Sequence, residues 1–345
     1  MSIALPDNPD HIYQLCSHLD LGQPAAAIRP VHGGFHHRMW RLQTDKAVYA
    51  VKQLSSDTDV ADPAVIAHFN LTETVANTFR DYGIHAVSAR SCRGEYLHLL
   101  DNTAYLVYPW VEASALPFSQ LSESHALEVA DILATMHRAD IRVPGLGPKT
   151  ADMHAEETIT AVIGRAGAEH VRYTRELEQG LPAFLDIGRD YKAAILVLAQ
   201  HLVVSHGDLD QKNVLWDSAG KSLLIDWESA HQINPVREVL QTALEWSGIT
   251  RQLDPLLFET FLSAYQRAGG VIADEFVEPA LRCILGDWLN WLMYVVDRAS
   301  MADNPIKRIR GAEQFDLVFT TLQRLDKQLP ELLAMPALRK PGNAA

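Results

Sequence analysis

Two carboxylates and one amide stand close together in one segment of the sequence. Asp208 and Asn213 are separated by five positions, and Asp226 directly follows the apolar run Leu223-Leu224-Ile225. Hard divalent cations such as Mg²⁺ take carboxylate and amide oxygens as ligands. Phosphoryl transfer needs a metal held in this way and a further Asp that accepts the hydroxyl proton. These residue types therefore indicate metal-assisted phosphoryl-transfer chemistry.

A predicted β-hairpin brings the three side chains together. Residues 214–216 and 222–225 have the pattern of short apolar strands, and residues 217–220 form a turn signal between them. Because a hairpin returns the chain to its starting point, Asn213 and Asp226 become neighbours, while Asp208 lies on the loop that enters the hairpin. An exposed turn residue is the alternative interpretation of Asp226, although that is unusual directly after an apolar strand.

The spacing within this segment resembles a known family. Residues 206–213 read His-Gly-Asp-Leu-Asp-Gln-Lys-Asn, and residues 225–227 read Ile-Asp-Trp. The kinase signature has His, Asp, Leu and Asn at the same intervals, with Arg in place of Gly207. The form with Gly is similar to the aminoglycoside phosphotransferase and choline kinase-like family, within the protein-kinase-like superfamily. Most of the chain follows the family's order of elements.

The resemblance implies roles for individual residues. Asp208 would be the catalytic base, and Asn213 and Asp226 the metal ligands. His206 would support the loop that carries Asp208, and Glu238 would also stabilise this loop, so both residues would have structural roles. Many relatives have His-Pro-Gly where this sequence has Asp210-Gln211-Lys212, so Asp210 adds a negative charge that Lys212 would offset.

A lysine on a predicted strand forms the nucleotide side of the expected site. Lys52 ends the alternating run Val48-Tyr49-Ala50-Val51-Lys52, in which Val48, Ala50 and Lys52 share one face. This run resembles the V-A-I-K strand of kinases. A lysine on a buried face needs a partner. Phosphates and Glu73, on a predicted helix at residues 62–82, are the expected partners. A strand-end lysine and a surface glutamate are the alternatives.

Two further segments are expected to contact ATP. Gly33 and Gly34 precede the lysine strand, and backbone N–H groups of glycine-rich loops can approach phosphates. The neighbouring histidines have no regular metal-ligand set, so they are interpreted as loop residues. Residues 105–111 resemble the hinge that binds adenine, with Tyr108 and Trp110 as the named contacts. GTP stays an alternative nucleotide, and the absence of a G-x-x-x-x-G-K-[ST] loop disfavours a P-loop kinase.

The acceptor is expected to bind the C-terminal half. Asp287, Trp291 and Tyr294 share one face of a predicted helix at residues 277–298, and Glu228 is a further candidate. Acidic and aromatic groups suit a cationic or amine acceptor through charge and cation–π attraction. Core packing of the aromatic residues is the alternative.

The predicted elements give an α+β fold with two lobes. Strands dominate residues 1–109, which form the expected nucleotide-binding lobe, and helices dominate residues 110–345, which form the expected lobe with the catalytic loop and acceptor site. Helices are predicted at residues 122–138, 182–200, 236–247, 255–268 and 277–298. The resemblance implies a protein-kinase-like architecture with a small β-rich N-lobe and a larger helical C-lobe.

Composition limits the partners. The 345 residues carry a formal net charge of −13, which argues against nucleic acid as the main partner and is compatible with a cationic acceptor or with a simple solubility role. No stretch has the length of a membrane span, and the first ten residues lack the pattern of a secretory signal. Three distant cysteines suit reduced thiols, so a cytoplasmic protein is expected.

The sequence thus predicts an ATP- and Mg²⁺-dependent kinase for a hydroxyl group of a small molecule, such as an aminoglycoside-like antibiotic, choline, an amino alcohol or a sugar. A non-catalytic nucleotide-binding pseudokinase is the main alternative. A protein kinase is disfavoured, because Asp226-Trp227-Glu228 contains no glycine and no Ala-Pro-Glu segment follows.

Overall fold

The structure is a computed structural model that describes residues 8–31, 37–149, 154–169, 171–301, 305–335 and 338. The chain forms two compact units. Unit 1 comprises Met1–Gln120, Ile141–Gly147 and Val204–His231, and unit 2 comprises Leu121–Asp140, Pro148–Val203 and Gln232–Ala345. No helix among the described residues is long and apolar enough to cross a membrane.

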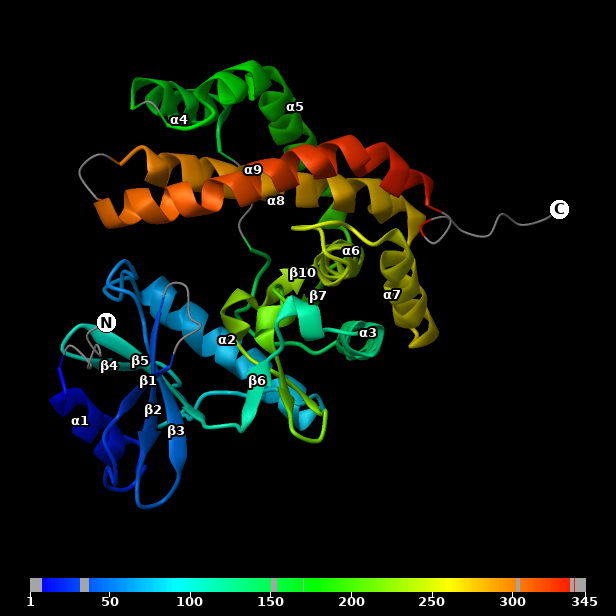
Figure 1. Cartoon of the computed structure of the whole chain (residues 1–345). Coiled ribbons are helices and arrows are strands. Elements are labelled where there is room, and N and C mark those ends of the chain that lie inside the picture. Colours follow the sequence, from blue (N-terminus) through cyan, green and yellow to red (C-terminus); the bar gives the residue numbers. More distant parts are fainter. Residues whose placement is uncertain are drawn as a thin grey trace. The chain divides into compact units, whose positions relative to one another are not determined.

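An antiparallel sheet of five strands, in the order β1-β2-β3-β5-β4, forms the centre of the N-terminal part of unit 1 (Figure 1). The strands are β1 (Arg29–Val31), β2 (Arg38–Gln43), β3 (Val48–Gln53), β4 (His98–Leu100) and β5 (Thr103–Pro109). On the central strand β3, Lys52 lies opposite Met39 of β2 and Leu106 of β5.

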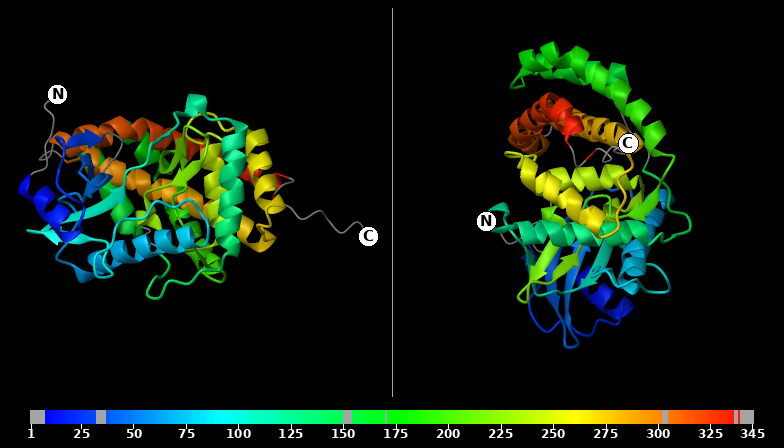
Figure 2. Two further views of the ribbon diagram at one scale, coloured as in Figure 1. Left: turned by 90° about the horizontal axis from the view of Figure 1, so that it is seen from below. Right: turned by 90° about the vertical axis from the view of Figure 1, so that its right-hand side faces the viewer.

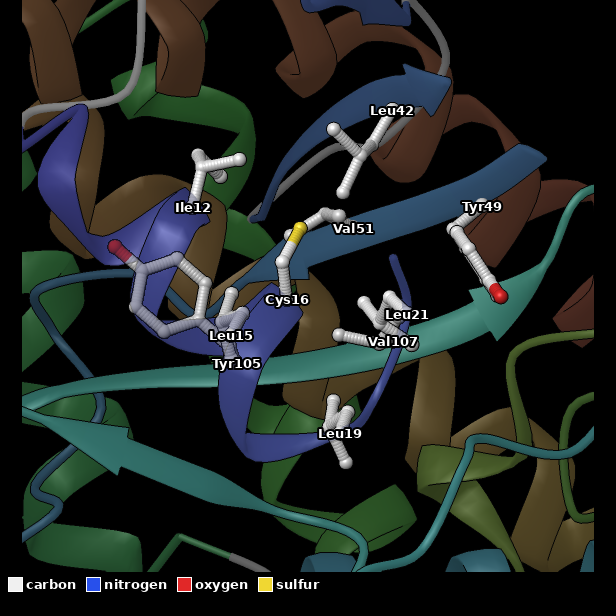
Figure 3. Close-up of a cluster of buried hydrophobic side chains, with 10 residues drawn as sticks. All are labelled: Ile12, Leu15, Cys16, Leu19, Leu21, Leu42, Tyr49, Val51, Tyr105 and Val107. Carbon is white, nitrogen blue, oxygen red and sulfur yellow. The ribbon is translucent and has the colours of Figure 1, made fainter. Parts of the chain in front are cut away.

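Apolar side chains cover both faces of this sheet. Helix α1 (Asp10–His18) packs Ile12, Leu15 and Cys16 against one face, where they join Tyr49 and Val51 of β3 (Figure 3). Strand residues alternate between faces. Because Tyr49 and Val51 belong to this cluster, Lys52 points to the opposite face, as the alternation predicts. There a second cluster holds Leu54, Phe69, Ala89, Leu97, Ala104 and Leu106.

Helix α2 (Pro63–Asp81) supplies Phe69 to this second face. Its start follows from local chemistry. The Asp62 side chain caps it by accepting a hydrogen bond from the Ala64 N–H, and Pro63 occupies the first turn, where no N–H is needed. Gly83 follows its end with a φ of +101°. The predicted helix at residues 62–82 is therefore confirmed.

The predicted hairpin is also present. It consists of β8 (Val214–Asp217) and β9 (Ser222–Leu224), and β6 (Ala113–Ala115) extends it on the β8 side. Two backbone hydrogen bonds join Leu224 to the segment that follows α2. The Leu224 N–H donates to the His85 carbonyl oxygen, and the Leu224 carbonyl oxygen accepts from the Val87 N–H, each at 2.9 Å. These bonds place the hairpin in unit 1, whereas the predicted division at residue 109 assigns it to the C-terminal lobe. That functional division stays a prediction.

Unit 2 is helical. Its helices are α3 (Glu123–Arg138), α4 (Glu156–Ala168), α5 (Thr174–Leu198), α6 (Pro235–Trp246), α7 (Pro255–Arg267), α8 (Asp274–Ala299) and α9 (Pro305–Ala334). The two long helices α8 and α9 lie side by side in all views (Figures 1 and 2). Two short strands, β7 (Val203–Ser205) and β10 (His231–Ile233), pair with each other.

The sequence predicted some of the helix starts in unit 2 and missed others. Asn234 and Asp254 cap α6 and α7, each followed by proline in the first turn, and these starts were predicted. By contrast, α5 begins eight residues before Pro182. A proline more often marks the first turn, so the prediction started this helix too late. Helices α4 and α9 and strands β7 and β10 were not predicted.

Three buried polar side chains connect helices α3, α6 and α7. His137 Nε2 lies 2.8 Å from Glu238 Oε2, and His137 Nδ1 lies 2.8 Å from the Tyr265 hydroxyl. Burial and the Glu238 charge raise the pKa of Tyr265, so its hydroxyl is neutral and donates to Nδ1. The His137 proton on Nε2 then faces Glu238. Buried polar groups are favourable only when they are bonded in this way.

We predict that Glu238→Ala lowers the free energy of unfolding by about 3 kcal/mol, because it leaves His137 buried without an acceptor and opens a cavity. Glu238→Gln is the matched control, since its amide oxygen can still accept from His137, and it should lose less than half as much. Urea unfolding of both variants measures the difference. Equal losses would contradict the importance of the hydrogen bond.

Candidate active site

The loop that carries Asp208 is folded around Gly207. Gly207 has a φ of +76°, and a Cβ at this position would lie 2.3 Å from the Ser229 carbonyl oxygen and 2.8 Å from His231 Nδ1. Only glycine fits this conformation and this space. The structure thus explains why the sequence has glycine where the kinase signature has arginine.

His206 joins this loop to the end of the hairpin. Its side chain is fully buried, Nε2 lies 3.0 Å from the Ile225 carbonyl oxygen, and Nδ1 accepts a hydrogen bond from the Asp208 N–H at 3.3 Å. The ring also packs on Trp227, with centroids 4.5 Å apart. One imidazole therefore contacts both segments that carry the candidate acidic residues.

Asn213 fixes the side chain of Asp208. The Asn213 amide nitrogen donates to the Asp208 carbonyl oxygen at 2.7 Å and to its carboxylate Oδ2 at 3.0 Å. The Ile225 N–H donates to the Asn213 carbonyl at 3.0 Å, which closes the hairpin beside Asp226. Because the amide nitrogen of Asn213 donates its hydrogen bonds to Asp208, the side-chain oxygen of Asn213 is the atom suited to bind a cation.

The residues that depart from the family pattern form their own ion pair. Lys212 Nζ lies 2.6 Å from Asp210 Oδ2 and 3.3 Å from Asp208 Oδ2. Burial raises the pKa of Asp210, and Lys212 opposes that shift. Lys212 thus offsets the charge of Asp210, as the sequence suggested, and it also contacts the candidate base.

Asp226 lies two residues after the end of β9 and has a left-handed conformation, with a φ of +64°. Aspartate and asparagine tolerate this region better than most residues, and such conformations concentrate at functional sites. The turn leads into the short 3₁₀ helix η3 (Trp227–Ser229). Asp226 Oδ1 lies 2.7 Å from Lys52 Nζ.

Lys52 is only 6% exposed and lies between two carboxylates. Its Nζ is 2.7 Å from Asp226 Oδ1 and 2.7 Å from Glu228 Oε2. Burial by itself would lower the pKa of Lys52, but the two neighbouring carboxylates outweigh burial and raise it, so the ammonium stays charged. The predicted need of Lys52 for a charged partner is met within unit 1.

Glu73, the predicted partner of Lys52, interacts with it through charge but directs its hydrogen bonds to other groups. Glu73 Oε2 accepts from the Ala89 N–H at 2.6 Å, and Oε1 accepts from the Tyr108 hydroxyl at 2.6 Å. Burial raises the pKa of Glu73 to about 7, although both hydrogen bonds oppose the shift. Glu73 therefore connects α2 to β5 through two hydrogen bonds.

Glu228, predicted to contact the acceptor, binds Lys52 and His37 instead. His37 Nε2 lies 3.2 Å from the same Oε2 atom that Lys52 contacts. Burial would raise the pKa of Glu228, but the hydrogen bond from His37 and the charge of Lys52 hold it well below its usual range. His37 is a site residue that sequence reasoning missed, because an isolated loop histidine has no distinctive pattern.

Two further residues that the sequence predicts to contact the nucleotide, Tyr108 and Trp110, lie near the end of β5. Tyr108 directs its hydroxyl to Glu73, and the Trp110 indole N–H donates to Glu112 at 2.9 Å. Backbone bonds continue β5 to this point, since the Trp110 N–H donates to the Val48 carbonyl at 3.0 Å. Gly33 and Gly34 lie outside the described residues.

The acceptor candidates of α8 belong to unit 2. Trp291 and Tyr294 are 37% and 40% exposed, so they are not plain core residues. Asp287, however, is paired with the buried Arg237, whose Nη2 lies 2.6 Å away, and the Arg298 guanidinium lies 5.1 Å from the Tyr294 ring centroid. The predicted acidic character of this face is therefore largely neutralised. Arg237 was missed because its partner lies fifty positions away.

The donor chemistry near Lys52 fits a magnesium ion. Among the described residues no group of three His, Cys, Asp or Glu side chains could hold a metal. Asn213 and Asp226 supply one amide and one carboxylate oxygen, and Mg²⁺ commonly binds through one or two carboxylates while phosphates and waters complete its shell. These two residues suit an ion that arrives with a nucleotide.

A comparison with protein families identifies the chain. A model described as the phosphotransferase enzyme family (APH) matches residues 27–279. The chain belongs to this phosphotransferase family. The matched range includes every site residue of unit 1 named above, from His37 to Glu228, whereas Asp287, Trp291 and Tyr294 lie beyond it. The prediction of a phosphotransferase enzyme is confirmed.

Solved structures share the fold of this phosphotransferase. A spectinomycin phosphotransferase, APH(9)-Ia, in complex with ADP and spectinomycin is 14% identical, with a TM-score of 0.65 over 92% of this chain and 100% of that chain. Choline kinase LicA from Streptococcus pneumoniae is 17% identical, with a TM-score of 0.59 and coverage of 92% and 100%.

Macrolide 2′-phosphotransferase MphH from Brachybacterium faecium is 15% identical, with a TM-score of 0.54 over 90% of this chain and 98% of that one. These likenesses confirm the predicted α+β fold, with an antiparallel N-terminal sheet and a mostly helical C-terminal part. No curated protein matches the phosphotransferase in sequence.

We predict that Gly207→Ala costs about 2 kcal/mol more in unfolding free energy than Gly220→Ala. Both glycines have a φ near +77°, but a Cβ at Gly220 would meet nothing within 4 Å, so that variant carries the backbone strain alone. Thermal and urea unfolding of the two variants measure the difference. Equal losses of unfolding free energy in the two variants would show that the backbone shifts easily to relieve the contact between the new Cβ and the Ser229 carbonyl oxygen.

We also predict a pH-dependent stability difference between the wild type and Glu73→Gln. The folded state raises the Glu73 pKa from its ordinary value near 4.5 to about 7, so it favours the protonated carboxyl. The stabilisation is complete below pH 4.5 and is lost as the pH rises through 7. The free energy of unfolding of the wild type should fall by up to about 3 kcal/mol relative to that of Glu73→Gln between pH 4.5 and about pH 7. It should change little further at higher pH.

Urea unfolding at intervals from pH 4.5 to pH 8 measures this difference. The glutamine can keep both hydrogen bonds, because its oxygen accepts from the Ala89 N–H and its NH₂ donates to the Tyr108 oxygen. A difference that does not change with pH would mean that Glu73 ionises normally in the folded protein.

Proposed function

We propose that this phosphotransferase transfers the terminal phosphoryl group of ATP to a hydroxyl group of a small molecule. The observation that carries the proposal is the convergence of Asp208, Asn213, Asp226 and Lys52 within unit 1. Asn213 bonds to Asp208, and Asp226 bonds to Lys52, so a base, two metal-suited oxygens and a buried cation lie on connected segments. Phosphoryl transfer uses this set of groups.

In the proposed reaction Asp208 accepts the proton of the acceptor hydroxyl as the oxygen attacks phosphorus. The Asn213 amide holds Oδ2 of Asp208, which leaves Oδ1 directed to the incoming hydroxyl. Asn213 and Asp226 would hold Mg²⁺, which when bound neutralises charge on the phosphate oxygens. Lys52 supplies a positive charge to the same phosphates, and His206 keeps the loop of Asp208 against the end of the hairpin.

The acceptor is proposed to be a hydroxylated small molecule. Relatives in fold include proteins named for spectinomycin, choline and macrolides, so an antibiotic, an amino alcohol and a sugar are the classes to test. The pairing of Asp287 with Arg237 weakens the specific case for a cationic acceptor at α8. ATP is favoured over GTP by the ADP and the AMP in two complexes of the spectinomycin phosphotransferase.

We predict that Asp208→Asn lowers kcat by about 10³-fold while the Kd for ATP stays within about threefold, because the amide cannot accept the proton but keeps the size of the side chain. Acceptor-dependent ADP release measures turnover, with aminoglycosides, spectinomycin, choline, ethanolamine and simple sugars as acceptors. Calorimetry measures the binding of ATP.

Asp217→Asn is the matched control. Asp217 ends β8, and its carboxylate accepts from the N–H groups of Ala219 and Lys221. This change therefore alters the turn of the hairpin and leaves the residues of the proposed active site unchanged. It should keep wild-type turnover. Turnover of Asp208→Asn within tenfold of the wild type would refute Asp208 as the base. Mg²⁺-dependent ATP binding with no acceptor-stimulated turnover would favour a nucleotide-binding pseudokinase.

A further inference from the structure

Glu73 of α2 interacts with Lys52 through charge, but its hydrogen bonds go to other groups. Both carboxylate oxygens of Glu73 already accept short hydrogen bonds, one from the Ala89 N–H and one from the Tyr108 hydroxyl. The residue is only 2% exposed, and its raised pKa makes it a weak counter-charge near neutral pH. Recruiting Glu73 to Lys52 would leave a buried backbone N–H and a buried hydroxyl without acceptors, which costs about 1–3 kcal/mol for each group.

Glu228 lies where such a partner is needed. Its Oε2 is 2.7 Å from Lys52 Nζ. It is two residues from Asp226, and the left-handed turn at Asp226 directs both side chains to the same ammonium. Asp226 is also the proposed metal ligand. Glu228 is therefore the carboxylate that can keep Lys52 in place while Asp226 is engaged with a cation.

Two histidines from different elements hold Glu228. His37 Nδ1 accepts a hydrogen bond from the Ser55 N–H at 3.0 Å, which assigns the ring proton to Nε2. That Nε2–H donates to Glu228 Oε2 at 3.2 Å, and the His37 side chain is only 11% exposed. His68 of α2 contacts the Glu228 backbone carbonyl through Nε2 at 2.9 Å. Both the backbone and the carboxylate of Glu228 are thus fixed.

We propose that Glu228, oriented by His37, is the positioning residue for Lys52, in the place that the sequence pattern gives to Glu73. The proposal deepens the proposed function and rests on it, since Lys52 is taken to contact the nucleotide phosphates. Without Glu228 the ammonium loses one of its two partners and swings toward Asp226. It then meets the phosphates less often and competes for the oxygen that suits the metal.

A double-mutant cycle tests the proposal. Glu228→Ala should raise the Kd for ADP, measured by calorimetry with Mg²⁺, by about tenfold in the wild-type background. In a Lys52→Met background the same change should raise it by less than about twofold, because Glu228 acts through Lys52. Glu228→Gln, of the same size, replaces Glu228→Ala wherever circular dichroism shows that the alanine variant does not fold.

His37 is tested in the same way. His37→Ala should weaken ADP binding in the same direction as Glu228→Ala, and the two changes together should have little more effect than Glu228→Ala alone. His37→Gln retains an N–H donor near the position of Nε2 and should recover most of the lost affinity. Asp217→Asn serves again as the control and should leave the Kd for ADP unchanged.

Two results would overturn the proposal. An equal effect of Glu228→Ala in the wild-type and Lys52→Met backgrounds would show that Glu228 does not act through Lys52. A larger effect of Glu73→Gln than of Glu228→Gln would return the positioning role to Glu73. Because the readout is nucleotide binding, the cycle is informative even if no acceptor stimulates turnover, so failure here is distinct from failure of the proposed function.

Discussion

The buried ammonium of Lys52 is the constraint on which the architecture of unit 1 depends. A lysine that is 6% exposed is tolerated only when carboxylates neutralise it. The partners come from the end of the β8–β9 hairpin, more than 170 positions later in the chain. The hairpin must therefore dock beside the N-terminal sheet. The backbone bonds between Leu224 and the segment after α2 provide that docking.

Two unusual backbone conformations give the site its shape. Gly207 places the loop of Asp208 against the Ser229 carbonyl, and Asp226 turns the chain out of β9 in the left-handed region. Between them, the fully buried His206 bonds to the carbonyl before Asp226 and to the N–H of Asp208. One imidazole thus joins the loop that Gly207 allows to the segment where Asp226 adopts a conformation unusual for a residue other than glycine.

Two glutamates of unit 1 show how environment decides charge. Glu73 and Glu228 are both substantially buried, but Glu73 accepts hydrogen bonds from neutral donors, and burial raises its pKa to about 7. Glu228 faces Lys52 and His37, which hold its pKa low despite the burial. The same type of side chain therefore serves as a hydrogen-bonded connection between α2 and β5 in one place and as a counter-ion in the other. In unit 2, Arg237 likewise converts Asp287 from a candidate ligand into a paired charge.

The sequence by itself determined many of the elements and the family of this phosphotransferase. Period-two alternation predicted β3, apolar runs around a turn predicted the hairpin, and the spacing from His206 to Asp226 predicted the family, because these signals are local. Tertiary structure alone decided the ion-pair partners of Lys52, the raised pKa of Glu73 and the contacts of His37. Those contacts join residues 16 to 191 positions apart, and a carboxylate's charge depends on which donors reach it after folding. No local pattern encodes that choice.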